Sequence, residues 1–342
     1  MIVVDNPAHR LHDGGMEMHR GGLVPCYEMP SRADFILAAL REAGHPVRAP
    51  DAFPDDALLA VHDEAFVAFL RGAWARWTAA GHDGFMLPSA FPARALRRDV
   101  VPDSIHGAMG WWGFDTSTPM VAGTWAAARG AADAAMTAAS LLAAGERAAY
   151  ALCRPPGHHA GRATYGGYCF LNNAALAVER LRAHGRSRVA VLVVDFHHGN
   201  GTQDIFWRRG DVLFVSIHGD PRTEYPWFLG HADERGEGDG AGTTLNLPLP
   251  RGTAWPAYER ALGTALDAIA AFGAEALVVS LGVDTFEHDP ISAFALGADC
   301  FPRLGARLAA LGLPTVLVQE GGYAVAEVGH NVAAVVAAFA RA

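Results

Sequence analysis

Lysine is missing from the 342-residue sequence, so all 27 basic residues are arginine. Without a lysine amine the protein cannot form a Schiff base with a carbonyl substrate or with pyridoxal phosphate, and it cannot build a Walker phosphate loop. The sequence also lacks a basic run, and its formal net charge is −9. Because affinity for nucleic acid comes mainly from cations placed on phosphates, we expect no nucleic-acid partner.

Cysteine is scarce, and the sequence has no long apolar run. The four cysteines, Cys26, Cys153, Cys169 and Cys300, include no C-x-x-C pair, which indicates reduced thiols in a cytoplasm. No stretch of 18 apolar residues occurs, and the first residues lack the basic region and apolar stretch of a secretory signal. We therefore expect a soluble, cytoplasmic protein with no membrane partner.

Short apolar segments alternate with helical patterns along most of the chain, which is 51% hydrophobic and has 38 glycines. This alternation is typical of a parallel sheet with right-handed crossovers. We predict strands near 2–4, near 47 and at 148–152, 189–194, 212–217, 244–247, 276–280 and 315–318. We predict helices at 31–42, 63–80, 123–144, 172–184, 255–271, 301–310 and at the C-terminal end. The predicted fold is a three-layer α/β domain spanning residues 1–342, with about eight mostly parallel strands and helices on both faces.

Two stretches, 6–30 and 81–120, show no periodic pattern, and we interpret them as long loops. Loops of this length in a compact domain are usually functional or form interfaces. The second loop contains Trp111-Trp112-Gly113-Phe114. Aromatic residues at that density are typical of a pocket lining or a contact between copies of the chain, and a loop packed on its own side chains is an equally good interpretation.

The predicted strand at 189–194 leads directly into Asp195 and His197. Its continuous apolar run is typical of a strand that is buried on both faces of a sheet. Along an extended chain, residues i and i+2 point to the same side, so the Asp195 carboxylate and the His197 imidazole face the same region. This spacing is compatible with two metal ligands, and an ordinary strand end with one capping carboxylate is the simpler alternative.

Polar clusters follow four of the predicted strands, and their convergence is stronger evidence than any one of them. They are Arg154-Pro-Pro-Gly-His158-His159, Asp195-Phe-His197, Gly282-Val-Asp284 and Glu320-Gly-Gly-Tyr323. In open α/β sheets, ligands bind outside the carboxyl ends of the strands, so these clusters are expected to meet in one crevice.

Asp195, His197 and Asp284 form a three-ligand set with one open position, as a catalytic metal site requires. Oxygen-rich ligation is compatible with zinc, ferrous iron or cobalt. A bound water would have its pKa lowered to about 7, which yields a hydroxide nucleophile at neutral pH. His158 and His159 are candidates for proton transfer, and Tyr323 for hydrogen bonding to a developing oxyanion.

Five motifs together resemble the arginase-deacetylase superfamily, and within it the histone deacetylase and acetylpolyamine amidohydrolase family. They are RPPGHHA (154–160), GGYCFLNNAA (166–175), DFHHGNGTQ (195–203), SLGVDTFEHDP (280–290) and QEGGY (319–323). The resemblance covers essentially the whole chain and implies the arginase-deacetylase fold. The long loops resemble those of the acetylpolyamine amidohydrolase branch, where they close over the active site of a homodimer.

The resemblance implies a zinc-dependent amidohydrolase that removes acetyl groups from acetylated amines, above all acetylpolyamines, by attack of a metal-bound hydroxide. It assigns zinc to Asp195, His197 and Asp284, general base and then acid catalysis to His159, an electrostatic role to His158, and carbonyl polarisation to Tyr323. It places Gly167, Tyr168, Tyr225 and Ile291 along a narrow substrate channel. It also implies a structural potassium ion held by backbone oxygens around Asp195, His197, Ser216 and Ile217.

One residue departs from the family pattern. The family commonly has an aspartate two residues before the first metal-binding aspartate, and here that position is Val193. Without this carboxylate, His158 should be less readily protonated and less firmly oriented. We expect activity with an altered pH profile.

The choice of substrate depends on the residues at the mouth of the channel. Family members that act on acetylpolyamines place carboxylates near the channel mouth to meet the distal ammonium group. Here Glu17 in the first long loop is the candidate, whereas Asp115 in the second is better explained as a solvated loop charge beside His106 and Ser117. We expect acetylputrescine-like or acetylcadaverine-like substrates, or small mimics of acetyl-lysine.

Three other functions are compatible with parts of the pattern. A ureohydrolase of the arginase kind shares the fold but uses two manganese ions, for which Asn200 replaces a useful carboxylate. A histone-deacetylase-like enzyme would act on acyl-lysine in proteins. A non-catalytic sensor of acetylated amines or metal would not need Tyr323 together with the pair His158 and His159.

Overall fold

A computed structural model describes all residues from Met1 to Ala342 and contains one eight-stranded sheet, whose neighbouring strands are all parallel. The strand order is β4-β1-β5-β10-β9-β6-β7-β8. The strands are β1 (Ile2–Asp5), β4 (Val47–Arg48), β5 (Ala148–Leu152), β6 (Val189–Val193), β7 (Val212–Gly219), β8 (Thr244–Leu249), β9 (Ala276–Leu281) and β10 (Thr315–Gln319). The prediction of about eight mostly parallel strands is confirmed.

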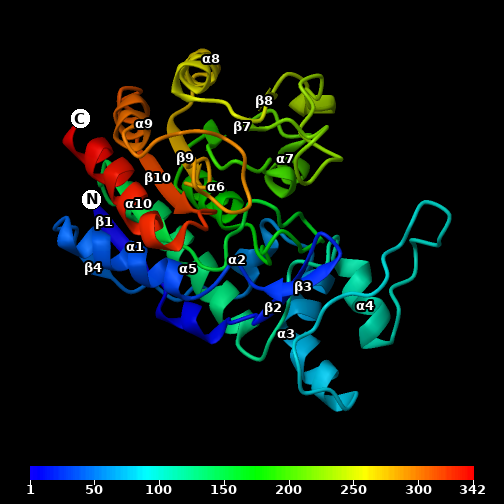
Figure 1. Cartoon of the computed structure of the whole chain (residues 1–342). Helices are drawn as coiled ribbons and strands as arrows, with labels where there is room; N and C mark the ends of the chain where they lie inside the picture. The colour runs from blue at the N-terminus through cyan, green and yellow to red at the C-terminus, as the bar shows by residue number, and fades with distance from the viewer.

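Helices cover both faces of this sheet, which gives the three predicted layers (Figure 1). One face carries α5 (Thr124–Ala143) and α6 (Asn173–Ala183), whose hydrophobic core extends to α3 (Glu64–Ala79), and the other carries α1 (Ser31–Glu42), α8 (Trp255–Phe272), α9 (Cys300–Ala309) and α10 (Val325–Arg341). Figure 1 shows α1 beside α10, although the two helices lie at opposite ends of the chain.

Strand β6 illustrates why the apolar run had to be continuous. Val189 and Val191 contribute to the hydrophobic core on one face of the sheet, and Ala190 and Leu192 to the core on the other. All four side chains are fully buried. Because successive side chains alternate between faces, a strand covered on both sides needs an apolar residue at every position.

The two stretches interpreted as loops contain regular structure, so that part of the prediction is wrong. Residues 6–30 include the 3₁₀ helix η1 (Pro7–Leu11) and an antiparallel hairpin, β2 (Met16–His19) and β3 (Gly22–Pro25). Residues 81–120 include α4 (Ile105–Trp112), and two further short helices, α2 (Asp56–Leu59) and α7 (Asn200–Phe206), were not predicted. These elements are too short to show a hydrophobic period.

The aromatic cluster in the second stretch divides between two environments. Trp112 is buried in the core, where its ring lies 5.8 Å from that of Phe66 and 6.1 Å from that of Phe69. Phe114 instead stacks against Tyr225, with the ring centres 6.3 Å apart. No aromatic residue of this motif lines the pocket itself: Trp112 packs on α3, and Phe114 supports the pocket residue Tyr225 from behind. No helix in the structure combines the length and apolar character needed to cross a membrane.

Candidate active site

The four polar clusters follow four strands that are consecutive in the sheet, β5, β10, β9 and β6. Since all four strands run parallel, their carboxyl ends lie along one edge, where a ligand crevice forms in open α/β sheets. Residues from the four clusters line or adjoin a single cavity at that edge, of about 480 Å³. The predicted convergence is therefore found in the structure.

Asp195, His197 and Asp284 lie together at the bottom of this crevice. Their candidate ligand atoms are all within 4.8 Å of one another. The Nδ1 atom of His197 is 2.9 Å from a carboxylate oxygen of Asp284 and 3.4 Å from one of Asp195. Both carboxylates are fully buried, whereas His197 is 9% exposed and lines the cavity. The three side chains thus present their ligand atoms toward one point that is open on the cavity side.

The charges at this point fit a divalent cation. The burial of His197 lowers its pKa, but the carboxylates of Asp195 and Asp284 outweigh burial and raise the pKa to about 10. Burial, and next the charge of Asp195, holds the pKa of Asp284 well above its usual range. Two buried carboxylates therefore require nearby positive charge, and two carboxylates with one imidazole are a donor set that zinc and similar metals accept.

The carboxylates are held in place by backbone N–H groups from separate loops. Gly321 donates to Asp195 at 2.8 Å, and Phe196 donates to Asp284 at 2.7 Å. A Cβ atom at Gly321 would lie 2.6 Å from an Asp195 carboxylate oxygen and 2.7 Å from one of Asp284. Only glycine allows the backbone to approach the two carboxylates this closely.

His159 lies beside this centre and is oriented by Asn200, the first residue of α7. Its Nδ1 atom is 2.6 Å from the Asn200 Oδ1 atom, so Nδ1 carries the hydrogen and Nε2 is left as a proton acceptor. Burial, and next the neighbouring His158, lowers the pKa of His159 well below its usual range. Sequence reasoning did not identify this role of Asn200. A Cβ atom at Gly167 would lie 2.3 Å from the His159 ring, so this side of the site also requires glycine.

His158 is buried behind His159, and the two rings are 4.0 Å apart. Its Nε2 atom is 3.8 Å from a carboxylate oxygen of Asp195, and its Nδ1 atom has no hydrogen-bond partner. The Val193 side chain is on this unpaired side: a Cβ atom at Gly199 would lie 3.0 Å from Val193 Cγ2 and 3.6 Å from His158 Nδ1. Burial lowers the pKa of His158 to about 4, and the effect of Val193 on its protonation stays a prediction.

Tyr323 completes the lining of the cavity bottom. Its backbone N–H donates to Asp289 at 2.7 Å, and the Arg32 guanidinium lies over its ring, 4.6 Å from the ring centre. Arg32 is itself buried and donates to the carbonyl oxygen of Gly322 at 2.6 Å. Neither Asp289 nor Arg32 was assigned a role from the sequence. Asp289 lies within the DTFEHDP motif, whereas nothing in the sequence marks Arg32, which is 291 positions from Tyr323.

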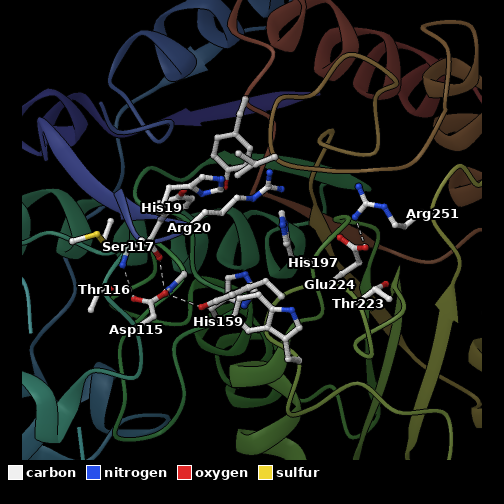
Figure 2. A pocket seen from close by; sticks show the side chains of 18 residues that line it. His19, Arg20, Asp115, Thr116, Ser117, His159, His197, Thr223, Glu224 and Arg251 are labelled. Atoms are coloured by element: carbon white, nitrogen blue, oxygen red, sulfur yellow. Dashed lines mark hydrogen bonds and ion pairs between the residues drawn. The ribbon is translucent and has the colours of Figure 1, made fainter. Parts of the chain in front are cut away.

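The predicted channel residues Gly167, Tyr168, Tyr225 and Ile291 all line the cavity, together with His159, His197 and Tyr323. Figure 2 shows His159 and His197 side by side at its centre. The Tyr225 ring meets the ring of His159 edge-on at 5.2 Å, and the Tyr168 ring is 5.6 Å from that of Tyr323. Aromatic side chains thus enclose the space above the two histidines.

The interpretation of the two mouth carboxylates was wrong in both cases. Glu17 is fully buried and does not line the cavity; its carboxylate accepts hydrogen bonds from the Tyr168 hydroxyl at 2.8 Å and the Tyr27 N–H at 3.2 Å. Asp115 does line the cavity, and it accepts from the Gly167 N–H at 2.7 Å and the Tyr225 hydroxyl at 2.8 Å. Asp115 is therefore a structural anchor of the channel and not a solvated loop charge.

The residues expected around a potassium ion lie within β7 and just after the end of the neighbouring strand β6. Ser216 in β7 pairs in register with Val193 in β6, and the Ser216 hydroxyl is 2.9 Å from His218 Nδ1. Ser216 and Ile217 are fully buried, as is Asp195. The potassium site itself stays a prediction.

Comparisons with known proteins agree with this geometry. A family model described as "Histone deacetylase domain" matches residues 26–339. Acetylpolyamine amidohydrolase 1 of Pseudomonas aeruginosa is 54% identical over 333 residues, covering 97% of this chain and 96% of that protein. The acetylpolyamine amidohydrolase of Mycoplana ramosa is 50% identical over 334 residues, covering 97% and 98% of the two chains.

A crystal structure of the acetylpolyamine aminohydrolase from Burkholderia pseudomallei superposes with a TM-score of 0.95 at 40% identity, covering 99% of this chain and 98% of that one. The fold and the site define a metal-dependent hydrolase of the arginase-deacetylase architecture. The chain belongs to the histone deacetylase family.

The unpaired nitrogen of His158 leads to a prediction for Val193. Replacing Val193 with aspartate should place a carboxylate near His158 Nδ1, raise the pKa of His158 and shift one limb of the pH profile of kcat/KM to higher pH, with activity retained. The sign follows because a nearby negative charge favours the imidazolium. Val193→Asn is the matched control, since it supplies an acceptor of the same shape without charge. An unchanged profile in Val193→Asp would contradict this account.

Proposed function

We propose that this protein is a zinc-dependent amidohydrolase that removes acetyl groups from small acetylated amines, acetylpolyamines among them. The observation that carries the proposal is the placement of His159, His197 and Tyr323 on one cavity, directly above the buried carboxylates of Asp195 and Asp284. The names of the relatives from Pseudomonas aeruginosa and Mycoplana ramosa support the same reaction and substrate class.

We assign the metal to Asp195, His197 and Asp284. When bound, a divalent metal polarises the acetamide carbonyl and lowers the pKa of water. His159 then accepts the proton of the attacking water at Nε2, because its Nδ1–H is held by Asn200, and it returns a proton to the leaving amine. Tyr323 donates its hydroxyl hydrogen to the carbonyl oxygen as negative charge develops there. His158 supports this proton transfer as an electrostatic neighbour of His159.

We propose zinc as the metal, and the same donors would also accommodate ferrous iron or cobalt. The structural potassium ion around Asp195, His197, Ser216 and Ile217 belongs to this proposal as well. The aspartate that commonly supports that site is Val193 here, so we expect potassium to bind more weakly than it would with a carboxylate at this position.

The structure gives arguments against two of the three other candidate functions. A ureohydrolase holds a second metal ion beside the first, and Asn200, which stands where a further carboxylate ligand would help, is engaged with His159 instead. A sensor without catalysis would not need a histidine whose Nδ1 is held so that Nε2 can accept a proton. An acyl-lysine deacetylase acting on proteins uses the same chemistry, and only its choice of substrate differs.

We also propose that residues 1–342 form a single catalytic unit that works in the cytoplasm as a homodimer joined through the long loop segments. Exposed apolar side chains in the segment 81–120 support this contact, namely Leu96, Val100 and Val101. Sedimentation as a single chain at micromolar concentration would contradict the dimer.

Acetate release from a panel of acetylated amines tests the proposed function. We expect the zinc-loaded enzyme to release acetate and free diamine in equal amounts from N-acetylputrescine and N-acetylcadaverine, and to act far more slowly on an acetylated protein. The cavity, lined by Tyr168, Tyr225 and Tyr323, favours a slender substrate. No acetate from any member would favour a binding protein, and faster turnover of acetylated protein would favour the acyl-lysine deacetylase.

A further inference from the structure

Four charged side chains line the mouth of the cavity, and three of them have partners. Asp115 accepts hydrogen bonds from Gly167, Tyr225 and Ser117. Glu224 is buried and accepts from Arg251 at 2.6 Å. Arg20, the fourth, is exposed and forms no ion pair and no hydrogen bond within the chain. The Asp115 carboxylate is held by neutral donors, and Glu224 and Arg251 neutralise each other, so Arg20 is the one charged side chain at the mouth that has no partner.

Arg20 lies in a backbone conformation that does not suit its side chain. It is the first of the two turn residues between β2 and β3, with φ 49°, and Gly21 follows with φ 82°. Positive φ at both positions is typical of a tight hairpin turn, where glycine or asparagine is preferred. A long side chain in this region is strained, and strain of this kind is concentrated at functional sites. Gly21, the second turn residue, adopts its positive φ without strain because it is glycine. The geometry of the turn therefore does not account for an arginine at position 20.

The hairpin directs this arginine toward the substrate. Figure 2 shows the Arg20 side chain reaching from the hairpin into the pocket, on the side opposite Arg251 and Glu224. Its neighbour His19 also lines the cavity, and burial together with the charge of Arg20 lowers the pKa of His19, so that it adds no positive charge at neutral pH. Because Arg20 and His197 line the same cavity, a substrate whose acetamide reaches His197 can extend its far end toward the unpaired guanidinium.

We propose that the site also hydrolyses acetamides whose far end is a carboxylate, that is, N-acetylated ω-amino acids, and that Arg20 is the residue that binds this carboxylate. This inference rests on the proposed amidohydrolase function and extends it to an anionic substrate class. The reaction is the same hydrolysis: water adds to the carbonyl carbon, the C–N bond breaks, and the nitrogen takes a proton, which yields acetate and a free amino acid.

Arg20 would bind the substrate carboxylate far from the reacting atoms, and this position determines which kinetic constants depend on the contact. An interaction that is equal in the ground state and the transition state changes KM and leaves kcat nearly constant. Because Arg20 is exposed, the contribution should also weaken as the salt concentration rises. A structural defect in the metal centre would instead lower kcat for every substrate.

Three acetamides with the same five-methylene chain provide the test. They are 6-acetamidohexanoate, which ends in a carboxylate, N-acetylcadaverine, which ends in an ammonium group, and 6-acetamidohexanamide, which is neutral. We expect Arg20→Gly to lower the ratio of kcat/KM for the carboxylate to that for the amide by about tenfold, mainly through KM. The ratio for the ammonium substrate to the amide should rise. The Tm should not fall, since glycine suits the turn.

The exposed arginine Arg41, which forms no ion pair and lies outside the cavity, is the matched control, and Arg41→Ala should leave both ratios unchanged. Equal carboxylate-to-amide ratios in the wild type and in Arg20→Gly would overturn the inference while leaving the amidohydrolase function intact. Hydrolysis of the amide and N-acetylcadaverine without hydrolysis of the carboxylate would do the same. Failure of all three acetamides with zinc-loaded protein would overturn both proposals.

Discussion

Acetate release should fall by at least about 10³-fold when Asp284 is replaced by asparagine, because several kcal/mol of transition-state stabilisation come from the metal that this carboxylate helps to hold. Asparagine keeps the size of the side chain and can still accept the hydrogen bond from the Phe196 N–H, which is 2.7 Å long here. What it removes is the negative charge beside His197. The metal content per chain, measured on the same preparation, should fall with the activity.

The control for this substitution is Asp299→Asn, an exposed aspartate at the start of α9 that pairs with Arg303. It makes the same chemical change far from the cavity, so activity and metal content should both stay at the wild-type level. Asp284→Asn protein that binds metal normally and turns over at more than about a tenth of the wild-type rate would contradict the ligand assignment.

Replacing Tyr323 with phenylalanine should lower kcat by about 10²–10³-fold with little change in KM. The Tyr323 side chain lines the cavity, and the substitution removes only its hydroxyl oxygen. The contact of the ring with Arg32 and the hydrogen bond from the backbone N–H to Asp289 are both kept. Metal content and Tm should therefore be unchanged. Burial holds the pKa of Tyr323 well above its usual range, so the hydroxyl stays protonated and can donate throughout the neutral and alkaline range.

A matched substitution at a neighbouring tyrosine separates hydrogen bonding to the substrate from general effects on the cavity. Tyr168→Phe removes a hydroxyl that is 2.8 Å from the Glu17 carboxylate, so it should disturb the channel lining and raise KM more than it lowers kcat. A Tyr323→Phe enzyme with kcat within a few-fold of the wild type would show that the phenol does not stabilise charge in the reaction.

Much of the fold could be predicted because the pattern of apolar residues within each strand indicates whether one or both of its faces are buried. The run Val189–Val194 is apolar at every position. Val189 and Val191 lie in the core on one face of the sheet, and Ala190, Leu192 and Val194 lie in the core on the other. The convergence of Asp195, His197 and Asp284 followed from parallel strands that end at one edge, and this needed no knowledge of distant contacts.

The parts that could not be predicted depend on contacts between residues far apart in the sequence. Arg32 reaches Tyr323 because α1 packs against α10, and no local pattern in either segment indicates that contact. Glu17 and Asp115 were both identified as carboxylates in loops, but only the three-dimensional arrangement shows which one faces the cavity. Their roles were exchanged in the prediction for this reason. Short elements such as α7 were missed because seven residues are too few to show a helical period.

The most direct test of this account is a metal titration of the apoprotein followed by acetate release. Protein stripped by exhaustive dialysis against a chelator is expected to be inactive, and activity should rise linearly with added zinc and level off at one ion per chain, where Asp195, His197 and Asp284 are saturated. Full activity in the metal-free protein, or a plateau reached only at two ions per chain, would contradict the single metal centre on which the proposed function depends.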